Sequence, residues 1–394
     1  MSPRLLQLNV TANWGSTGKI AEGIGLAAMA RGWESVIAYG RYMNPSQSQL
    51  IKVGNKLDVY SHYAKAKLFD GEGLGSRLAT KALIRKIEIL APDVIHLHNI
   101  HDHWLNYHLL FEYLVSINTP IVWTFHDCWA FTGGCTYFDA PDCKQWKERC
   151  EDCALRGWGI DRSTRNFNLK KNLLSKFASK LVIVPVSHWL EELCYESFLK
   201  NIDIRLIHNG IDTNRFKPCA DKTFKPLILG VALPWCERKG LDDMLKLREL
   251  LSSESIDMAM IGLSKKQLKK LPKAIIGIEK TQNAYELAQW YSRAWVYINP
   301  THSDNFPTVN LEALACGTPV ITYRTGGSTE AVDKETGIVI KKGDVKGLAD
   351  AIRKVINNPS IYRSANCRQR AEKNFNQEIQ YDKYIDLYEE LLNR

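Results

Sequence analysis

Two series of short apolar runs, in which each run precedes a segment of helical spacing, constrain this chain more than any other feature. Such alternation is typical of successive strand–helix–strand units that build a parallel sheet. Glycine, proline and charged residues interrupt both periodicities over 208–226, between the two series. Because 394 residues exceed what one hydrophobic core usually spans, the sequence predicts two parallel-sheet domains that meet at this break.

The predicted elements follow the apolar runs and the helical spacing between them. Strands are expected at 5–10, 36–39, 94–97, 121–125, 181–186 and 204–207, and then at 227–232, 257–261, 274–278, 296–299, 319–323 and 337–340. Helices are expected at 18–31, 76–90, 104–116 and 188–199, and then at 240–252, 284–294, 307–316 and 346–357. The stretch 359–394 also has helical spacing, and its end could cross back to brace the first domain.

The composition narrows the function classes. No segment contains the ~18 uninterrupted apolar residues of a membrane span, and the first residues lead into a strand without the apolar core of a secretory signal. We therefore expect a cytoplasmic location. The net charge of +9 suits phosphate-bearing ligands or an anionic membrane face, but no nucleic-acid fingerprint accompanies it. The densest basic run, 265–273, is interpreted as a solvated helix face.

The loop after the first predicted strand carries glycines and a Gly-Lys pair, so we compared it with a phosphate-binding loop. A Walker A loop needs a glycine five residues before Gly18 and a hydroxyl residue after Lys19, whereas Asn13 and Ile20 occupy those positions. A weaker interpretation survives. Gly15 and Gly18 would let an anion approach the N-terminus of the following helix, and a plain strand-to-helix turn is the alternative.

A second loop, at 299–308, is more specific. Pro307 suits the first turn of a helix, because its missing N–H would be unpaired there anyway, so the N–H groups of 308–310 are expected at the carboxyl edge of a parallel sheet, where ligands bind. Asp304 and Glu312 would repel a phosphate unless they address sugar hydroxyls. A hydrolytic acid–base pair is disfavoured. Eight residues at a helical rise of ~1.5 Å each would separate the two Cα atoms by ~12 Å, whereas the carboxylates of such a pair lie ~5 to 9 Å apart.

Two cations would oppose phosphates at the same edge. Arg238 and Lys239 follow the predicted strand 227–232 and open a helix. Each charge-assisted contact with a phosphate would contribute about 1.5 to 3 kcal/mol. The alternative is that both are solvent-exposed loop charges.

These residues resemble the family 4 retaining glycosyltransferases, and within them the group of colanic-acid-like and other surface polysaccharide synthesis. The resemblance covers nearly the whole chain. It rests on the glycine loop, HLHN at 96–99, TFHD at 124–127, HNGIDTNRF at 208–216, RKG at 238–240, NAYELAQWYSRA at 283–294 and DNFPTVNLEALACGTPV at 304–320. It implies a GT-B fold, with two Rossmann-like domains facing each other across a cleft: an acceptor domain at 1–208, a nucleotide-sugar donor domain at 209–375 and a helix at 376–394 that returns to the first domain.

The family's motifs also imply roles for individual residues. Glu312 is similar to the carboxylate that holds the nucleotide ribose, Asp304 to the one that meets the donor sugar, and Lys239 to the diphosphate-binding lysine. Gly15 and Gly18 correspond to the glycine loop that closes on the phosphates. Backbone N–H groups for the sugar and the diphosphate would come from Asn305, Phe306, Pro307 and Thr308. His126 matches a histidine beside the reacting centre.

The sequence departs from the family in two places. Asp304 stands for the usual glutamate and shortens its reach by one methylene. Val231 follows Gly230, where many members have an arginine, and we interpret Arg238 as the compensating cation.

The implied function is a metal-independent hexosyltransferase that moves a sugar from a UDP- or GDP-sugar, with retention, to a glycan or a polyprenyl-diphosphate-linked acceptor at the inner face of the membrane. Dipoles and cations aimed at the departing diphosphate would lower the barrier. The alternatives are a GT-B epimerase or phosphorylase, or a non-catalytic nucleotide- or zinc-binding interaction protein. The basic and apolar helix predicted at 76–90 could touch anionic lipid or could pack inside the domain.

Histidines and cysteines leave further alternatives. His126 could be a structural residue at a strand end, with Asp127 capping the next turn. The histidines at 96–103 lack a pattern that fixes a metal geometry.

Four cysteines lie in a loop-like insert at 133–153: Cys135, Cys143, Cys150 and Cys153. A Cys-x2-Cys pair with two further thiolates is compatible with a structural zinc site, but also with free thiols or disulfides.

Overall fold

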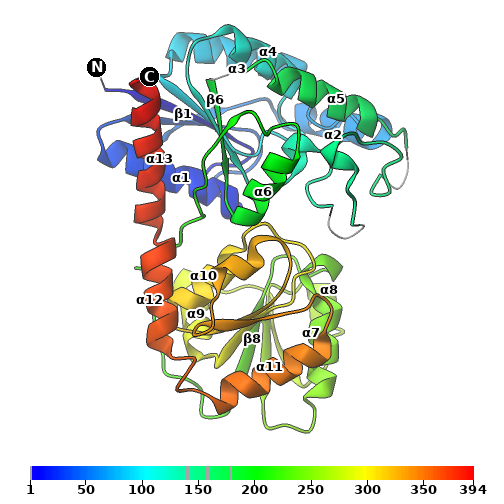
Figure 1. Ribbon diagram of the computed structural model, residues 1–394, viewed down its shortest axis with the longest axis vertical. Coiled ribbons are helices and arrows are strands. Elements are labelled where there is room, and N and C mark those ends of the chain that lie inside the picture. The colour runs from blue at the N-terminus through cyan, green and yellow to red at the C-terminus, as the bar shows by residue number, and fades with distance from the viewer. Residues whose placement is uncertain (1, 139–141, 157–158, 178–179) are drawn as a thin grey trace. The chain divides into compact units, whose positions relative to one another are not determined.

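The computed structural model describes residues 2–138, 142–156, 159–177 and 180–394. The chain divides into two compact units (Figure 1). Unit 1 comprises the chain up to His208 together with Gln380–Arg394, and unit 2 comprises Asn209–Ile379. The end of the chain therefore belongs to the same unit as its beginning.

Unit 1 is built on a parallel seven-stranded sheet. Its strands are β1 (Arg4–Asn9), β2 (Glu34–Tyr39), β3 (Gln49–Lys52), β4 (Val94–Leu97), β5 (Ile121–Phe125), β6 (Leu181–Pro185) and β7 (Asp203–Ile204), in the order β3-β2-β1-β4-β5-β6-β7. The helices are α1 (Gly15–Ala30), α2 (Lys56–Phe69), α3 (Arg77–Leu90), α4 (Tyr107–Ser116), α5 (Ser163–Leu174) and α6 (His188–Glu196). The central strands β1, β4, β5 and β6 are almost completely buried runs, as expected for a parallel sheet covered on both faces.

The C-terminal helix α13 (Gln377–Leu392) completes the core of unit 1. Tyr384 and Tyr388 are fully buried in a cluster with side chains of α1 and of strands β1, β4, β5 and β6. Figure 1 shows α13 beside α1. Gly23 of α1 is required here, because a Cβ atom at this position would lie 2.2 Å from the ring of Tyr381. The sequence thus uses a missing side chain to bring the two helices together.

Unit 2 repeats the architecture with six parallel strands. They are β8 (Leu227–Val231), β9 (Asp257–Ile261), β10 (Ile275–Ile278), β11 (Val296–Asn299), β12 (Val320–Tyr323) and β13 (Gly337–Ile340), in the order β10-β9-β8-β11-β12-β13. The helices are α7 (Leu241–Leu250), α8 (Lys265–Leu268), α9 (Ala284–Arg293), α10 (Thr308–Ala315), α11 (Val345–Asn357) and α12 (Ser364–Phe375).

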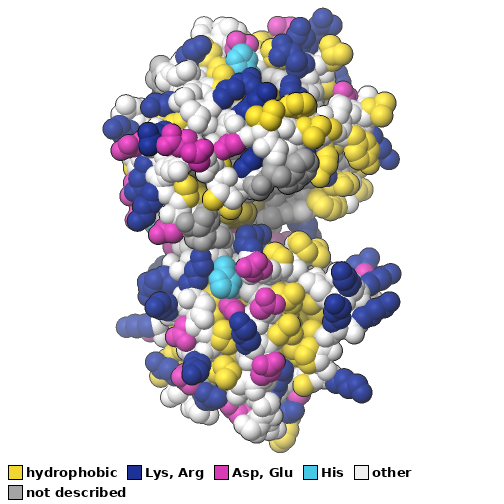
Figure 2. Space-filling model, turned by 90° about the vertical axis from the view of Figure 1, so that its right-hand side faces the viewer, with side chains coloured by type: hydrophobic (Ala, Val, Ile, Leu, Met, Phe, Trp, Pro, Cys, Tyr) yellow, Lys and Arg dark blue, Asp and Glu magenta, His cyan; other side chains and the backbone are white. Residues whose placement is uncertain are grey.

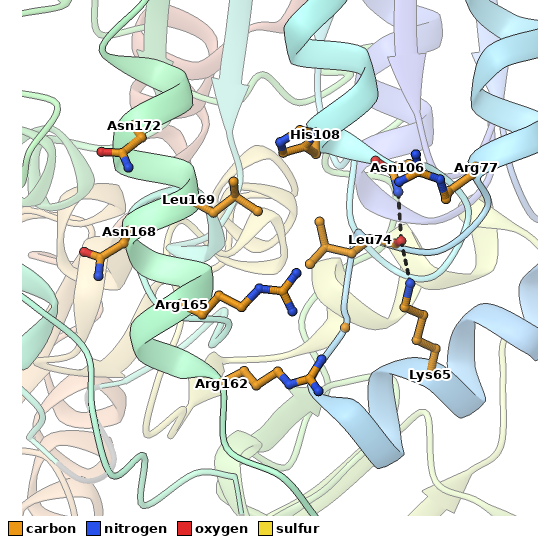
Figure 3. A pocket seen from close by; sticks show the side chains of 11 residues that line it. Lys65, Leu74, Arg77, Asn106, His108, Arg162, Arg165, Asn168, Leu169 and Asn172 are labelled. Atoms are coloured by element: carbon orange, nitrogen blue, oxygen red, sulfur yellow. Dashed lines mark hydrogen bonds between the residues drawn. The ribbon is translucent and has the colours of Figure 1, made fainter.

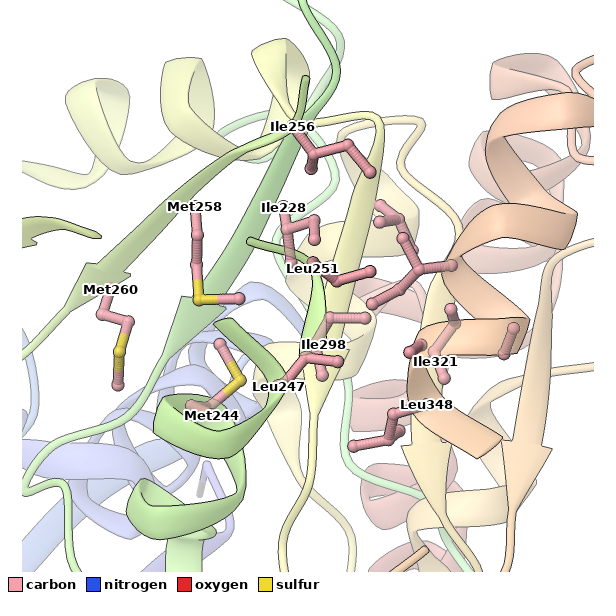
Figure 4. Packing of buried hydrophobic residues seen from close by; sticks show 14 of the residues in the cluster. Ile228, Met244, Leu247, Leu251, Ile256, Met258, Met260, Ile298, Ile321 and Leu348 are labelled. Atoms are coloured by element: carbon pink, nitrogen blue, oxygen red, sulfur yellow. The ribbon is translucent and has the colours of Figure 1, made fainter. Parts of the chain in front are cut away.

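The core of unit 2 lies between its sheet and the helices α7 and α11 (Figure 4). Met258 of β9 and Ile298 of β11 meet Leu247 of α7 and Leu348 of α11, and all four side chains are fully buried. The apolar positions of α11 recur every three or four residues, which gives the helix one apolar face toward the sheet. This packing fixes the sheet whose carboxyl edge carries the candidate site.

The predicted alternation of strands and helices is confirmed, with boundaries within a few residues at most elements. At the start of an element the largest differences are three residues: α1 begins at Gly15 rather than at residue 18, and α4 at Tyr107 rather than at residue 104. Sequence reasoning missed β3, α2 and α5, whose apolar residues are too few or too scattered to make a periodic signal. Within the described residues, no helix is long and apolar enough to cross a membrane.

Candidate functional site

The strand order of each sheet reverses at one place, and this selects the loops that can hold a ligand. In unit 2 the chain moves outward in opposite directions from β8 and β11, which are neighbours. Ligands of open parallel sheets bind outside the carboxyl ends of such neighbouring strands. The loop after β8 carries Arg238 and Lys239, and the loop after β11 carries Asp304. The topology therefore brings together two motifs that lie 65 residues apart in the sequence.

Lys239 and Asp304 form an ion pair at this edge. The Nζ atom of Lys239 lies 2.5 Å from Oδ2 of Asp304, and the two side chains are only 19% and 12% exposed. The other carboxylate oxygen of Asp304 accepts a hydrogen bond from the backbone N–H of Asn305 at 3.1 Å. Asp304 thus holds both the ammonium group and the loop that follows it.

Arg238 and Gly240 fix the turn that presents Lys239. Arg238 donates a hydrogen bond from Nη1 to the carbonyl of Ser303 at 2.7 Å, so its guanidinium contacts the loop that carries Asp304. Gly240 has φ +74°, and a Cβ atom there would lie 2.2 Å from the carbonyl oxygen of Pro300. Only glycine satisfies both conditions. The loops after β8 and β11 are consequently locked against each other.

The start of α10 departs in part from expectation. Pro307 is the N-cap and Thr308 the first helical residue, so Pro307 lies one position earlier than predicted and, as an imino acid, has no N–H to offer a ligand. The N–H of Asn310 donates to the carbonyl of Pro307 at 3.1 Å. That amide is therefore used within the first turn and does not point out of the sheet edge.

The residues before α10 are packed into unit 2. The carbonyl of Asn305 accepts a hydrogen bond from the N–H of Gly327 at 3.0 Å. Phe306 is 5% exposed, and its ring centroid lies 5.7 Å from that of Phe375. This packing makes the loop a rigid approach to the helix N-terminus, where a positive dipole end favours anions.

Glu312 lies on the second turn of α10 and has a buried partner. The hydroxyl of Tyr291, on α9, donates to Oε2 of Glu312 at 2.9 Å. Burial and then the charge of Glu312 raise the pKa of Tyr291 well above its usual value, so the phenol stays protonated and keeps donating. Tyr291 is a site residue that sequence reasoning missed. Its only sequence signal is its place in the motif at 283–294, where it reads as an ordinary apolar position.

In unit 1 the corresponding reversal of strand order lies between β1 and β4. The loop after β1 carries the predicted glycines. Gly15 has φ +68°, which favours glycine, and a Cβ atom at Gly18 would lie 2.6 Å from Oγ1 of Thr11. The loop closes through a hydrogen bond from the N–H of Asn13 to the carbonyl of Gly18 at 3.1 Å. Gly18 is thus needed for the loop's own packing, whatever ligand the loop meets.

His126, after β5, belongs to a chain of hydrogen bonds that fixes its tautomer. Gln7 donates from Nε2 to the carbonyl of Ala21 at 2.8 Å, so its Oε1 accepts from Nε2 of His98 at 3.0 Å. Nδ1 of His98 is then the acceptor for the Nε2–H of His126 at 3.1 Å. The neutral imidazole of His126 therefore carries its lone pair on Nδ1. Burial lowers the pKa of His126 to about 4, so this neutral form prevails near pH 7.

Asp127 has a local structural role. One oxygen accepts from the N–H of Trp129 at 2.9 Å, and the other lies 2.8 Å from Nε2 of His101. Burial lowers the pKa of His101, but the charge and hydrogen bond of Asp127, together with the charges of Glu72 and Asp102, raise it more, so the pKa is raised overall. This carboxylate therefore stabilises the loop around His126.

The histidines at 96–103 do not share a metal site. His96 is bonded to Thr124 at 2.7 Å and to Tyr388 at 2.6 Å. Among the described residues, one group has its potential ligand atoms within 4.8 Å of one another, namely His62, Glu72 and His103.

The potential metal-ligand atoms of that group already form hydrogen bonds or ion pairs within unit 1. His62 accepts a hydrogen bond from the N–H of Gly75 at Nε2, at 3.1 Å, and its Nδ1 lies 3.0 Å from Oγ of Ser76. Glu72 accepts from the N–H groups of Asp102 and His103 and pairs with the His103 ring. Asp102 and His103 have positive φ values, 76° and 68°. Glu72 therefore holds a strained turn, and a metal ion does not fit this group.

The four cysteines of the predicted insert border one cavity of about 320 Å³. All ten cysteines of the chain lie in described residues and none forms a disulfide, so the disulfide interpretation is not supported. Gly133 donates its N–H to Sγ of Cys150 at 3.2 Å. Within the described residues, however, no three of the sulfurs lie within 4.8 Å of one another. The sulfurs lie farther apart than the ligands of a tetrahedral zinc ion, so the structure gives no support to the structural zinc, which stays a prediction. Residues 139–141 of the insert lie outside the described residues.

Both units match models of glycosyltransferase families. Residues 22–215 match the model described as Glycosyltransferase Family 4, and residues 223–374 match that described as Glycosyl transferases group 1. The two Rossmann-like domains of this chain, each built on a parallel sheet, place it in the class of GT-B proteins. The chain belongs to the family 4 glycosyltransferases, and it is accordingly a glycosyltransferase.

Relatives and solved structures agree with this assignment. The chain is 23% identical to a putative colanic acid biosynthesis glycosyl transferase, WcaC, of Escherichia coli K12, over 98% of this chain and 100% of that protein. It is 36% identical to the capsular polysaccharide biosynthesis glycosyltransferase CapM of Staphylococcus aureus, over 26% of this chain and 28% of that one. Polysaccharide biosynthesis is thus represented in its family.

Two solved structures share the fold over nearly the whole length. Sucrose-phosphate synthase from Thermosynechococcus elongatus superposes with a TM-score of 0.76 at 18% identity, covering 99% of both chains. HepE of Anabaena, in complex with UDP-glucose, superposes with a TM-score of 0.65 at 14% identity, covering 98% of this chain and 99% of that one. At these identities the superpositions establish the GT-B fold.

Proposed function

We propose that this chain transfers a hexose-type sugar, with retention of anomeric configuration, from a UDP- or GDP-sugar to a glycan or lipid-linked acceptor in surface polysaccharide synthesis. The observation that carries the proposal is the Lys239–Asp304 pair beside the N-terminus of α10. A partly shielded ammonium group and a helix dipole at one sheet edge suit a diphosphate, because both favour negative charge that grows on the leaving group.

The carboxylates take separate roles in this proposal. Glu312, oriented by Tyr291, binds the ribose hydroxyls of the nucleotide. Asp304 holds Lys239 in place. We assign it, in addition, to contact with the donor sugar. Asp304 positions the ammonium group at the sheet edge before the donor arrives, and the diphosphate can then pair with the same ammonium group.

Charge stabilisation by protein groups supports a reaction that needs no metal ion. Lys239, Arg238 and the start of α10 supply positive charge or positive dipoles at the edge of unit 2. On unit 1, the neutral His126 offers Nδ1 as a hydrogen-bond acceptor for a sugar hydroxyl. Gly15 and Gly18 shape the loop that we assign to the phosphate side of unit 1.

The test is product analysis with defined substrates. The purified chain is incubated with UDP- and GDP-hexoses and with glycan and polyprenyl-diphosphate acceptors, with and without EDTA, and the product's anomeric proton coupling is read by NMR. We expect one donor to give a retained linkage at an unchanged rate in EDTA. An inverted linkage or loss of activity in EDTA would contradict the corresponding part, and an isomerised sugar nucleotide without acceptor would point to an epimerase.

A further inference from the structure

Two exposed aromatic rings lie together at the carboxyl edge of the unit 1 sheet and have no role in the proposed donor site. Trp14 follows β1 and Tyr42 follows β2, and their ring centroids lie 4.7 Å apart with the ring planes inclined by 35°. The two side chains are 46% and 51% exposed, and no other tryptophan among the described residues is as exposed as Trp14. Exposed aromatic surface at a sheet edge indicates a place where a ligand packs.

Hydrogen bonds join the two loops that carry these rings. The N–H of Ala12 donates to the carbonyl of Tyr42, and the N–H of Asn44 donates to the carbonyl of Ala12, both at 3.0 Å. Two asparagine side chains add bonds between the same loops: Asn13 donates from Nδ2 to the carbonyl of Pro45 at 2.6 Å, and Asn44 donates from Nδ2 to the carbonyl of Asn13 at 2.8 Å. The rings are therefore held in place before a ligand arrives, which lowers the entropic cost of binding.

The side chain of Trp14 does little for the fold. Trp14 is the N-cap of α1, but its side chain makes no capping hydrogen bond. Its backbone carbonyl accepts from Oγ1 of Thr11 at 2.7 Å, whereas its indole N–H has no hydrogen-bond partner within the part of the chain that the structure describes. A large ring that belongs neither to the core nor to a cap, and that keeps a donor available, is suited to contact a ligand.

An ion pair from the neighbouring loops borders the rings. Nη1 of Arg41 lies 2.7 Å from Oδ2 of Asp102, which follows β4, and the two side chains are partly exposed. The guanidinium of Arg41 also lies 5.3 Å from the ring centroid of Tyr42. Asp102 has φ +76°, and its N–H donates to Glu72 at 2.7 Å. Such strained backbone persists where the surrounding structure fixes it, and it clusters at binding sites.

The loops after β1, β2 and β4 thus contribute to one surface. Because the strand order of unit 1 reverses between β1 and β4, this surface lies where open parallel sheets bind ligands. A few polar groups beside aromatic side chains are typical of sites for small molecules.

The charge of this surface differs from that of a large cavity elsewhere in unit 1. That cavity measures about 620 Å³, and Lys65, Arg77, Arg162 and Arg165 line it (Figure 3). No carboxylate of the described residues lines it, and Lys and Arg side chains gather on the face of unit 1 that Figure 2 shows. Beside the two exposed rings, in contrast, the charge of Arg41 is balanced by a carboxylate. The aromatic surface therefore suits an uncharged ligand.

A pyranose ring matches these features. Its axial C–H bonds give it an apolar face, which packs on the electron-rich face of an aromatic ring. Its hydroxyl groups need donors and acceptors nearby, and a guanidinium, a carboxylate and an indole N–H supply both. A planar nucleobase would stack on one ring only, because the two ring planes are inclined to each other.

We propose that Trp14 and Tyr42 form a subsite for a neutral hexopyranose unit of the acceptor, whose apolar face packs on the rings and whose hydroxyls meet Arg41 and Asp102. The inference rests on the proposed function, and it narrows the acceptor to a glycan that presents an uncharged sugar. The subsite itself needs no donor, so it can be tested apart from the transfer reaction.

Saturation-transfer difference NMR without a nucleotide tests the proposal. The probes are methyl β-glucopyranoside, methyl β-galactopyranoside, methyl α-mannopyranoside and methyl β-glucuronide. The proteins are the wild type, Trp14→Leu/Tyr42→Leu, Trp14→Phe/Tyr42→Phe and the control Tyr60→Leu/Tyr195→Leu, which removes two exposed rings from α2 and α6. Circular dichroism and thermal unfolding verify that each variant is folded.

We expect at least one neutral glycoside to receive saturation mainly at the protons of one ring face, which is the signature of stacking. Its affinity should fall about tenfold in the leucine variant and about threefold or less in the phenylalanine variant, and it should change by less than twofold in the control. The glucuronide should bind more weakly than the glucoside, because its carboxylate would enter a surface without net positive charge.

Three results would overturn the proposal. They are the absence of face-selective saturation for every neutral glycoside, equal weakening in the leucine variant and the control, and tighter binding of the glucuronide than of the glucoside. Isothermal titration with UDP and GDP separates this subsite from the donor site, and the nucleotide affinity should be the same in all four proteins. Loss of nucleotide binding in the leucine variant alone would assign the rings to the donor. Glycoside binding in a chain that binds no nucleotide would support the subsite and refute the proposed donor site.

Discussion

The two sheets share one topology, but their carboxyl edges carry opposite chemistry. Nine of the ten histidines precede residue 209, and in unit 1 His98 and His126 form a buried, neutral chain that begins at Gln7. Unit 2 has a single histidine and places the Lys239–Asp304 pair at the equivalent reversal of strand order. The fold thus determines where a ligand binds, and the loop residues determine whether fixed charge or neutral hydrogen bonding meets it.

The largest expected effect concerns the fixed charge of unit 2. Replacing Lys239 by methionine removes the ammonium group that we assign to the diphosphate and leaves Asp304 partly buried without its partner. We expect kcat/KM to fall about 100-fold, since charged hydrogen bonds contribute about 1.5 to 3 kcal/mol and an uncompensated carboxylate adds to the loss.

Arg238→Met is the comparison for that variant. It removes one positive charge from the same turn but leaves the ion pair intact, and the expected loss is smaller, about tenfold. Steady-state kinetics with saturating acceptor measure both. Equal losses in the two variants would mean that position on the turn, rather than the pair with Asp304, decides donor binding.

Acid should weaken unit 1 before unit 2. Burial lowers the pKa of His62 and of His126 to about 4, and the pKa values of His96 and His98 fall well below the usual value. A histidine with a depressed folded-state pKa stabilises the fold above its unfolded pKa of about 6.5, and this contribution is lost as the pH falls toward 4. For His62 and His126, whose folded-state pKa is about 4, protonation costs on the order of 2 kcal/mol each between pH 6.5 and 5. The raised pKa of His101 opposes this in part.

Hydrogen exchange with peptide resolution measures this difference. Peptides covering β1, β4 and β5 should lose protection about 30-fold or more between pH 7 and 5, after correction for intrinsic exchange, while those covering β8 and β11 lose little. The variant His302→Asn, in unit 2, serves as a control and should leave the profile unchanged. Parallel loss of protection in both units would show that the histidine network does not set the acid stability of unit 1.

A smaller effect is expected at His126. His126→Phe keeps a ring at this position but removes both the Nδ1 acceptor and the Nε2–H that donates to His98. We expect kcat to fall about tenfold, with donor KM changed by less than threefold, because one neutral hydrogen bond contributes about 0.5 to 1.5 kcal/mol. His108→Gln, on α4, should leave both constants unchanged. A rise in donor KM alone would move His126 from the reacting sugar to ground-state binding.

The smallest effect concerns the orientation of Glu312. Tyr291→Phe removes the hydroxyl that donates to this carboxylate and retains the buried ring. Donor KM should rise about three- to fivefold with kcat nearly unchanged, since the loss is one hydrogen bond to a group that binds ribose. Glu312→Gln should raise KM further. If Tyr291→Phe alters kcat and leaves KM unchanged, the assignment of Glu312 to the nucleotide is wrong.

Much of the fold follows from sequence because buried parallel strands leave a strong signal. The runs at 94–97, 121–125, 257–261, 296–299 and 337–340 coincide with strands β4, β5, β9, β11 and β13. The helix α2 left none, since only two of its residues are buried and no apolar stripe marks its inner face.

The candidate site was less predictable than the fold. The ion pair joins residues 65 positions apart, and only the strand order brings them to one edge. Tyr291 lies on another helix and carries no motif of its own. The N–H of Asn310 was expected to face a ligand, but the first turn of α10 tightens onto Pro307 and uses it. Residue types indicated which loops form the candidate site, whereas the contacts between side chains and backbone groups within those loops depended on backbone geometry.

Isothermal titration of the wild type and the Lys239→Met variant with UDP, UMP, GDP and GMP tests the central claim most directly. For the preferred base, the wild type should bind the diphosphate at least about tenfold more tightly than the monophosphate, and this ratio should approach one in the variant. A ratio that is the same in both proteins would show that Lys239 does not recognise the diphosphate, and would contradict the proposed donor site.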